Sequence, residues 1–174
     1  TDHLRPWDPR RVTVTNAAGV AADMMAEYAL GAMLSFSLDL PGFRRKQQAR
    51  HWDLAGKVEP IEGRTVLIVG LGKTGEAVAR RARAMGMTVL GVRARPRPTP
   101  NVDEVHAIEA LPQLWGRADF IVCAVPLLDT TRGLIDGAAF AAMKPSAVLI
   151  DVSRGAVVDQ PALVAALDAG RLKG

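Results

Sequence analysis

Two short segments of this sequence combine residue types that bind anions. The first is a glycine-rich turn that directly follows the apolar run 65–69, Gly70-Leu71-Gly72-Lys73-Thr74-Gly75. The second is Ser153-Arg154-Gly155, which directly follows the apolar run 148–152. Backbone N–H groups at the start of a helix bind phosphate, and a guanidinium binds a carboxylate through two parallel hydrogen bonds. The two segments therefore predict a phosphate site and a carboxylate site.

The glycine-rich turn stands where a dinucleotide-binding fingerprint requires it. A strand pattern (65–69) precedes it, a helical pattern (75–85) follows it, and a second strand pattern (88–92) completes one βαβ unit. In such a turn the first glycine permits the sharp bend, the second lets a pyrophosphate approach the backbone, and the third lets the helix pack closely on its strand. We therefore predict that residues 70–75 bind a dinucleotide. The alternative is a glycine-rich turn that binds no ligand.

An arginine at the end of the second strand indicates which dinucleotide binds. An NAD-binding unit places Asp or Glu here to accept hydrogen bonds from the ribose hydroxyls. This sequence has Arg93 instead, with Arg95 and Arg97 close behind it. A guanidinium matches a 2′-phosphate and offers no acceptor to a bare diol. The pattern favours NADP(H), with NAD(H) possible, bound through Arg93 and Arg95. The alternative is a solvated basic loop, which we prefer for Arg97.

Arg154 leaves its strand at the sheet edge where the nicotinamide of such a cofactor is expected. There its guanidinium would bind the carboxylate of a small acid and polarise the adjacent carbonyl oxygen. The alternative, which the local sequence leaves equally open, is a structural ion pair with Asp151 or Asp159. Asp159 is also a candidate N-cap for the next helical pattern, with Pro161 in its first turn and Gly170 at its end.

Strand and helix patterns alternate from residue 63 onward. Apolar runs at 65–69, 88–92, 119–125 and 148–152 alternate with helical patterns at 75–85, 110–117, 137–143 and 160–169. Near-continuous apolar strands between helices are typical of a parallel sheet covered on both faces. We therefore predict an α/β fold of the Rossmann type, a doubly wound parallel sheet. Ligands gather at the carboxyl ends of such strands, so the expected cofactor site includes Val125, Pro126, Val152 and Ser153.

Residues 1–62 differ from this alternating region. A strand-like run (11–15) leads to an apolar helix (21–40), and Pro41-Gly42 then breaks that helix before a polar connector (43–62). A helix that is apolar on most sides has to be covered on most sides. Either this chain's own domain covers it, or a second domain or subunit does. Because the sheet already has its own helices, we expect a second domain or subunit. The predicted division is 1–62 for strand, crossing helix and connector, and 63–174 for the dinucleotide-binding domain.

The composition suits a cytoplasmic protein. Of the 174 residues 49% are apolar, no apolar run reaches membrane-spanning length, and the first residues lack the order of a signal peptide. The single cysteine, Cys123, is expected to be a buried thiol in a reducing compartment. The net charge of +4 invites nucleic-acid binding, but the basic residues are dispersed, aromatics are few and no zinc-ligand spacing occurs. We predict no nucleic-acid partner, no membrane partner and no metal site.

Together these motifs resemble the D-isomer-specific 2-hydroxyacid dehydrogenases, a family that includes glyoxylate/hydroxypyruvate reductases, phosphoglycerate dehydrogenases and formate dehydrogenases. The similarity covers nearly the whole sequence and comprises Val14-Thr15-Asn16, Gly19-Val20, Ala26-Glu27, Gly63, 69–75, Gly86-Met87, Pro126-Leu127, 131–135, 143–145, 151–155, Val158-Asp159 and Ala166-Leu167. The resemblance implies an NAD(P)-dependent oxidoreductase that transfers a hydride between a nicotinamide and a small D-2-hydroxy or 2-oxo acid. The present residues would mainly form its cofactor-binding domain.

The resemblance also implies roles for individual residues. The arginine that matches Arg154 binds substrate in the family, and the residues that match Pro126, Val152 and Ser153 line the nicotinamide side of the cleft. The helix that matches 21–40 crosses between two domains and packs across a homodimer. We therefore expect a homodimer whose helix 21–40 is covered by the other domain and the other subunit.

The sequence also departs from the family pattern. Leu128 stands where members usually carry Thr, which puts phosphate or ribose contacts on that side in doubt. Arg93 stands where NAD-using members carry Asp, which supports NADP(H). The family's catalytic Glu and His match no residue among these 174, because His3, His51 and His106 lie in other contexts. We therefore expect this chain alone to bind cofactor with almost no turnover.

Two other functions stay open on the sequence alone. One is a dinucleotide-sensing, corepressor-like binding module of the same fold, which the family's catalytic Glu and His would argue against if the parent protein has them. The other is a methyltransferase that uses S-adenosylmethionine. We place it lower, because that cofactor has no pyrophosphate to occupy the glycine-rich turn and would leave Ser153 and Arg154 without a role.

Overall fold

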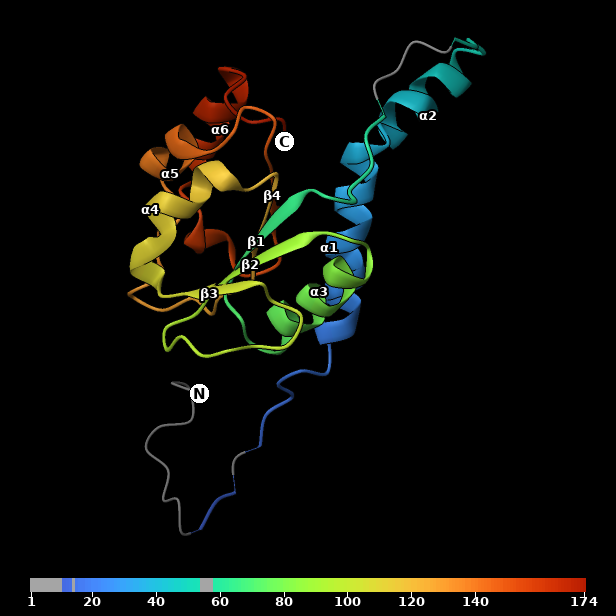
Figure 1. Ribbon diagram of the computed structural model, residues 1–174. Helices are drawn as coiled ribbons and strands as arrows, with labels where there is room; N and C mark the ends of the chain where they lie inside the picture. Colours follow the sequence, from blue (N-terminus) through green and yellow to red (C-terminus); the bar gives the residue numbers. More distant parts are fainter. Residues whose placement is uncertain (1–10, 14, 54–57) are drawn as a thin grey trace.

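A parallel sheet forms the centre of the protein. The computed structural model describes residues 11–13, 15–53 and 58–174, and within them five strands pair in the order β3-β2-β1-β4-β5 (Figure 1). The strands are β1 (Thr65–Val69), β2 (Thr88–Val92), β3 (Glu104–His106), β4 (Phe120–Cys123) and β5 (Val148–Asp151). Every neighbouring pair is parallel. This is the strand order of a doubly wound Rossmann sheet, so the predicted fold class is confirmed.

Two hydrophobic cores lie on the two faces of this sheet. Successive side chains of a strand point to opposite faces, so in β1 Val66 and Ile68 enter one core while Leu67 and Val69 enter the other. All four side chains are fully buried. This double burial explains why the strand is apolar at every position rather than at alternate ones.

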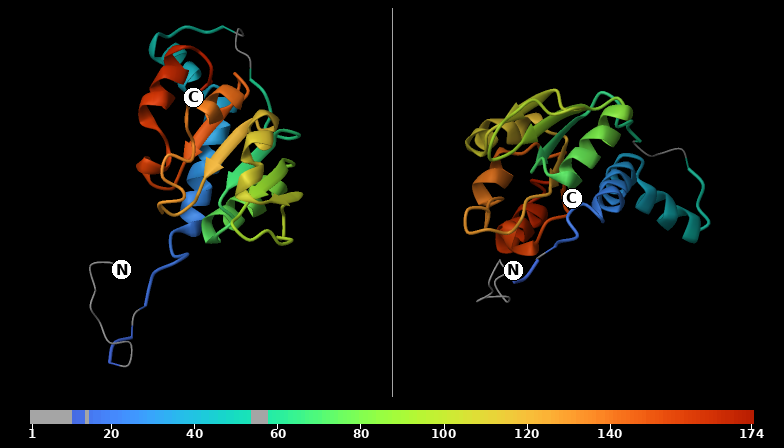
Figure 2. Two further views of the ribbon diagram at one scale, coloured as in Figure 1. Left: turned by 90° about the vertical axis from the view of Figure 1, so that its left-hand side faces the viewer. Right: turned by 90° about the horizontal axis from the view of Figure 1, so that it is seen from below.

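Helices cover both faces. One face is covered by α1 (Ala22–Ser37) and α3 (Lys73–Ala84), and the other by α4 (Leu111–Leu114), α5 (Gly137–Ala142) and α6 (Gln160–Asp168). Figure 2 shows α1 and α3, blue and green, on the opposite side of the sheet from the orange and red helices α5 and α6. The sheet is therefore enclosed in the way that a parallel sheet requires.

Helix α1 packs on this chain's own sheet along one face. Ala26, Ala29 and Met33 are fully buried in the core that α1 shares with α3 and β1. Met24 and Tyr28, on the other side of the helix, are 61% and 63% exposed. The expectation that a second domain or subunit covers most of this helix is therefore corrected for the first face, because the sheet of the same chain covers it.

The predicted polar connector instead begins with a helix, α2 (Leu40–Gln48). Asp39 adopts a left-handed conformation (φ 46°), and its carboxylate accepts a hydrogen bond of 3.1 Å from the Gly42 N–H. Pro41 occupies the first turn, where a helix needs no N–H donor. Helix α1 has already ended at Ser37, and Pro41-Gly42 lies in the first turn of the new helix, which extends beyond α1 and away from the sheet (Figure 1).

Two further elements differ from the sequence prediction. Residues 11–13 and 15 are exposed and form no strand, while Val14 lies outside the described residues. The edge strand β3 was not predicted, because Glu104-Val105-His106 contains no apolar run. In this strand, hydrogen bonds from Arg117 and His106 lower the pKa of Glu104 to about 2. The division at residues 62 and 63 stays a prediction. No helix in the described part of the chain is long and apolar enough to cross a membrane.

Candidate functional site

The predicted site segments meet at one edge of the sheet. Gly70 follows β1, Arg93 follows β2, Val125 and Pro126 follow β4 after one residue, and Val152 follows β5. All four strands are parallel and adjacent, so their carboxyl ends lie side by side. The winding reverses between β1 and β4, and ligands of such folds bind in the crevice at that reversal. The fold thus brings the sequence-predicted segments together at its expected binding edge.

The three glycines of the turn each have a distinct steric reason. Gly70 has φ 106°, and a Cβ there would lie 2.8 Å from the Ala124 carbonyl group. A Cβ on Gly75 would lie 2.0 Å from the Gly70 carbonyl oxygen. A Cβ on Gly72 would meet nothing within 4 Å. The first and third positions are therefore closed by this chain's own backbone, and the second opens to solvent, where another molecule can approach.

The N-terminus of α3 has no side-chain cap. Gly72 is its N-cap residue and supplies no side-chain acceptor, and the first hydrogen bond within the helix joins the Glu76 N–H to the Gly72 carbonyl. The N–H groups of Lys73 and Thr74 therefore have no backbone or side-chain acceptor among the described residues. Unpaired amides and the helix dipole together favour an anion at this position.

Leu71 has a structural role within the turn. Its side chain is 2% exposed and belongs to the hydrophobic core, and its N–H donates to the Val92 carbonyl at 3.1 Å. A Cβ on Gly91 would lie 2.5 Å from a Leu71 methyl carbon. Neither the side chain nor the amide of Leu71 faces the open side, whereas Lys73 is exposed and Thr74 is half-buried.

The arginines after β2 differ in their surroundings. The Arg93 side chain is 20% exposed, with Nη1 at 3.4 Å from Thr99 Oγ1 and 3.8 Å from Glu76 Oε1. Arg95 and Arg97 are exposed, and no side-chain hydrogen bond or ion pair of theirs is found within the described residues. Arg93 is therefore held at the sheet edge, while the guanidinium of Arg95 is free to turn toward a ligand.

A buried threonine closes the loop after β4. Thr131 is 6% exposed; its hydroxyl donates to the Pro126 carbonyl (2.6 Å) and accepts from the Leu128 N–H (2.8 Å). The loop that carries Val125 and Pro126 is thus fixed from within. Sequence reasoning missed this role, although Thr side chains are known to bond backbone groups three residues earlier in the chain.

The turn after β5 presents Arg154 to solvent. The Asp151 carboxylate accepts hydrogen bonds from the Ser153 N–H and hydroxyl, and Arg154 Nη1 donates to the Ser153 carbonyl at 2.7 Å. No ion pair joins Arg154 to Asp151 or Asp159 in the described residues. Asp159 instead caps α6, as predicted, by accepting from the Ala162 N–H at 3.1 Å. The ion-pair interpretation of Arg154 is therefore not supported, and its guanidinium is available to an anion.

Cys123 lies directly beneath this turn. It is fully buried and unpaired, and its thiol is 3.5 Å from the Ser153 hydroxyl. Burial, only partly offset by that hydrogen bond, raises the pKa of the Cys123 thiol. The thiol therefore stays protonated and serves as a small apolar side chain, as the sequence predicts.

Charge is arranged differently at the two edges of the sheet. At the amino edge, Asp119 accepts from the Thr65 N–H and from Lys144 Nζ, both at 2.9 Å. Burial alone would raise the pKa of Asp119, but these hydrogen bonds outweigh it and hold the pKa below its usual value. The carboxyl edge carries four basic residues, Lys73, Arg93, Arg95 and Arg154, and two acidic residues, Glu76 and Asp151. The amino edge is thus neutralised by its own pairs, and the carboxyl edge is left basic.

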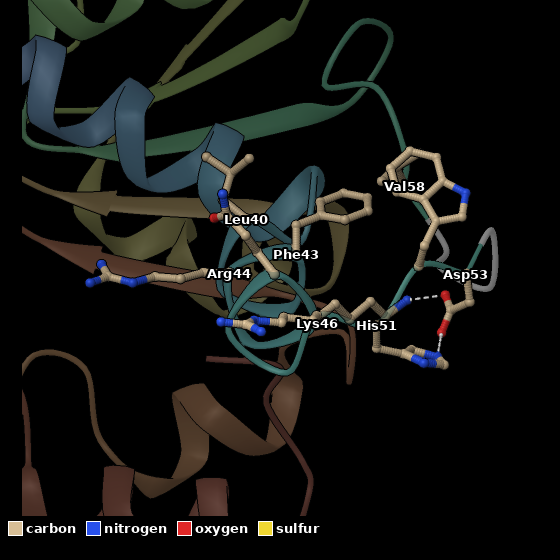
Figure 3. A pocket seen from close by; sticks show the side chains of 10 residues that line it. Leu40, Phe43, Arg44, Lys46, His51, Asp53 and Val58 are labelled. Carbon is tan, nitrogen blue, oxygen red and sulfur yellow. Dashed lines mark hydrogen bonds and ion pairs between the residues drawn. The ribbon is translucent and has the colours of Figure 1, made fainter.

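A large hollow lies away from this edge. It has a volume of about 1080 Å³ and is lined by α2 and the segment after it, including Leu40, Phe43, Trp52 and Val58 (Figure 3). Helix α1 starts near Lys73, because a Cβ on Gly19 would touch that side chain, and runs for 16 residues, about 24 Å, before α2 begins. This hollow is therefore not part of the dinucleotide edge.

Comparison with known proteins identifies relatives of the whole arrangement. The chain is 32% identical over 165 residues to a D-3-phosphoglycerate dehydrogenase of Methanocaldococcus jannaschii, covering 93% of the chain and 31% of the relative. It is 32% identical over 179 residues to a glyoxylate reductase of Thermococcus kodakarensis, covering 95% of the chain and 52% of the relative. The chain thus spans about half or less of these curated relatives.

A solved structure matches the fold closely. A D-isomer specific 2-hydroxyacid dehydrogenase from Xanthobacter autotrophicus Py2, in complex with NADPH and MES, has a TM-score of 0.83 and 33% sequence identity. The match covers 92% of this chain and 66% of that one. In addition, residues 30–174 match the family model of the D-isomer specific 2-hydroxyacid dehydrogenase, NAD binding domain. The chain therefore belongs to the D-isomer specific 2-hydroxyacid dehydrogenase family, of which it carries the NAD-binding domain.

Proposed function

We propose that this chain forms the cofactor half of an NADP(H)-preferring reductase of small 2-oxo acids. The observation that carries the proposal is the uncapped α3 N-terminus, which stands at the reversal of the sheet with Arg93 beside it. A dinucleotide with an additional 2′-phosphate matches both features, because the pyrophosphate meets free amides and the 2′-phosphate meets a guanidinium. The complex of the Xanthobacter relative with NADPH supports this choice.

The residues at the edge fit the parts of that cofactor. The open face at Gly72 and the amides of Lys73 and Thr74 would hold the pyrophosphate, and Arg93 and Arg95 the 2′-phosphate. Val125, Pro126, Val152 and Ser153 would line the nicotinamide end. When bound, the nicotinamide supplies or accepts the hydride. Glycine at position 72 leaves the approach open, so the residues present suit the group.

Arg154 would act on the substrate. Its exposed guanidinium would bind the carboxylate of a 2-oxo acid and polarise the neighbouring carbonyl oxygen, which gains negative charge during reduction. The Asp151 carboxylate fixes the turn from which Arg154 projects. In a form of the protein that spans the full length of its relatives, Arg154→Gln is expected to lower kcat/KM about 100-fold or more. Unchanged kcat/KM would remove Arg154 from the site.

The cofactor preference is tested by titrating the 174-residue chain with NADPH and NADH and following nicotinamide fluorescence. We expect NADPH to bind more tightly, and Arg93→Asp to reverse the order because the carboxylate accepts from the ribose diol and repels the phosphate. Arg97→Asp is the matched control, since it makes the same charge change on the same loop. Equal binding of the two dinucleotides, or a preference for NADH, would contradict the proposal.

We also propose that the chain pairs with a second copy through α1 and α2. Met24, Tyr28, Leu40 and Phe43 are each between 46% and 63% exposed, which leaves an apolar surface along both helices. Such surfaces mark interaction sites in folded proteins. Tyr28→Glu is expected to shift the chain to monomer in sedimentation velocity, whereas Val164→Glu, on the equally exposed surface of α6, is not. A monomer at every concentration before substitution would contradict a homodimer.

The cellular setting is a further proposal. A buried, unpaired Cys123 thiol and no second cysteine in the sequence are typical of proteins in reducing compartments. They support the cytoplasm as the location of the protein.

A further inference from the structure

Helix α3 places the carboxylate of Glu76 beside the Arg93 guanidinium, and this carboxylate has no role in the function proposed above. Glu76 lies in the first turn of α3, and its Oε1 is 3.8 Å from Arg93 Nη1. We propose that Glu76 contributes to cofactor specificity: its carboxylate repels the 2′-phosphate of NADP(H) and thereby reduces the preference for NADP(H) over NAD(H). This inference rests on the proposed NADP(H) preference and adds the residue that limits it.

The surroundings of Arg93 make Glu76 its ionic partner. Within residues 11–13, 15–53 and 58–174, the other side-chain contact of the guanidinium is the neutral Thr99 hydroxyl, at 3.4 Å. A small hollow of about 280 Å³ adjoins this contact, and its lining has one acidic residue, Glu76, and one basic residue, Arg80. Arg80 is already paired with Asp23 at 2.9 Å. The local balance of charge around Arg93 is therefore set by Glu76.

A phosphate bound by Arg93 would lie close to the Glu76 carboxylate. The phosphate and the carboxylate are both negative. Two like charges that contact the same guanidinium repel each other appreciably near a protein surface, where the effective dielectric constant is well below that of water. The carboxylate also offsets part of the guanidinium charge that would attract the phosphate. NAD(H) carries a neutral diol at this position, so neither effect weakens its binding. Glu76 should therefore penalise one dinucleotide and not the other.

A purely structural role for Glu76 makes a different prediction. An acidic residue in the first turn stabilises a helix through the helix dipole, and Glu76 is in the first turn of α3. Loss of that stabilisation would change the binding of NADPH and NADH by the same factor, because both dinucleotides use the same helix N-terminus. The ratio of the two dissociation constants thus separates the two roles.

The test is Glu76→Gln in the 174-residue chain, with dissociation constants for NADPH and NADH measured by nicotinamide fluorescence. Glutamine has the same size and removes only the charge. We expect NADPH to bind about three- to tenfold more tightly and NADH to change less than about twofold. The gain should shrink at high salt, because exposed charges are then screened. Glu62→Gln is the matched control, since Glu62 is exposed and precedes β1 at the opposite edge of the sheet.

Three results would overturn the inference. An unchanged NADPH:NADH ratio in Glu76→Gln, or the same ratio change in Glu62→Gln, would leave Glu76 without a specific effect. Weaker NADH binding in Glu76→Gln would show instead that the carboxylate accepts from the diol. Arg93→Gln distinguishes these failures from failure of the proposed function. If Arg93→Gln weakens NADPH and Glu76→Gln has no effect, the inference alone fails; if Arg93→Gln leaves NADPH binding unchanged, the proposed 2′-phosphate site fails with it.

Discussion

The N-termini of helices α3 and α6 differ in whether a side chain accepts a hydrogen bond from their unpaired amides. At α6 the Asp159 carboxylate accepts from the Ala162 N–H, and at α5 Asp136 does the same for the Ala139 N–H. At α3 a glycine occupies the capping position and no side chain accepts. A carboxylate cap stabilises a helix by accepting from an otherwise unpaired N–H group, and that donor is then no longer available to a ligand. The comparison shows that α3 forgoes a cap at the place where an anion can bind.

The same contrast extends to the sheet. At its amino edge carboxylates accept from amides in the first two residues of a strand, Asp119 from Thr65 of β1 and Asp103 from Val89 of β2. These contacts serve folding, because a buried donor without an acceptor is costly. At the carboxyl edge no carboxylate of the described residues accepts from the amides of Lys73 and Thr74 or pairs with Arg154. These donors are therefore available to an anion, whereas the donors at the amino edge are not.

The largest effect is expected where the turn before α3 is crowded. Gly75→Ala places a Cβ 2.0 Å from the Gly70 carbonyl oxygen, so helix and strand must separate. We expect a loss of about 2–4 kcal/mol in the free energy of unfolding, measured by urea denaturation. Gly72→Ala is the control, because its Cβ meets nothing within 4 Å. Equal stability of the two variants would show that the close packing is unimportant.

The next prediction converts α3 into a helix like α6. Gly72 has an extended backbone (φ −89°, ψ −164°) that any residue adopts, so Gly72→Asp introduces a carboxylate cap without strain. We expect stability to rise by a few tenths of a kcal/mol and dinucleotide affinity to fall at least about tenfold, because the carboxylate takes the amides and repels the pyrophosphate. Undiminished binding in a fluorescence titration would place the pyrophosphate elsewhere.

The converse change removes the cap of α6. Asp159→Ala leaves an amide unpaired and is expected to lower the free energy of unfolding by about 1 kcal/mol. Dinucleotide affinity should stay within about twofold of the unmodified chain, because in the unmodified chain the Asp159 carboxylate occupies this terminus and the dinucleotide therefore does not use it. A substantially weaker complex would mean that α6 takes part in binding, and the contrast between the two helices would fail.

The smallest effect concerns pH and the amino edge. The pKa of Asp119 is lowered in the folded protein, so its contribution to stability is present above its unfolded value of 3.8 and is lost as the pH falls through the folded value. Between about pH 6 and about pH 2 the unmodified chain should therefore lose stability relative to Asp119→Asn, by at most about 1 kcal/mol. Parallel pH profiles of the two proteins, from urea midpoints, would contradict this.

The sequence predicted the central unit well because local signals dominate there. The strands β1 and β2 have the predicted limits, and Asp159, Pro161 and Gly170 act as predicted at the ends of α6. Each signal depends on the residue itself and its near neighbours: a β-branched run, a capping carboxylate, a glycine with positive φ.

The features that the sequence could not predict are set by distant contacts. The edge strand β3 forms because β2 offers it a partner, not because Glu104-Val105-His106 favours a strand. Glu76 of α3 and Arg93 after β2 lie close together only in the folded protein, and no spacing rule predicts this contact from the sequence. Helix α2 is different: Pro41 is compatible with both a helix break and a helix start, and the Asp39 cap decides between them.

The buried Cys123 thiol beneath the Arg154 turn can be used to measure how often this edge of the sheet opens. Cys123 is the single sulfhydryl of the sequence, it is inaccessible in the folded state, and its raised pKa suppresses the thiolate that labelling reagents attack. Labelling must therefore wait until β4 and the turn over it separate. The labelling rate, compared with that of an unstructured peptide thiol, would give the opening equilibrium of this edge without any engineered probe.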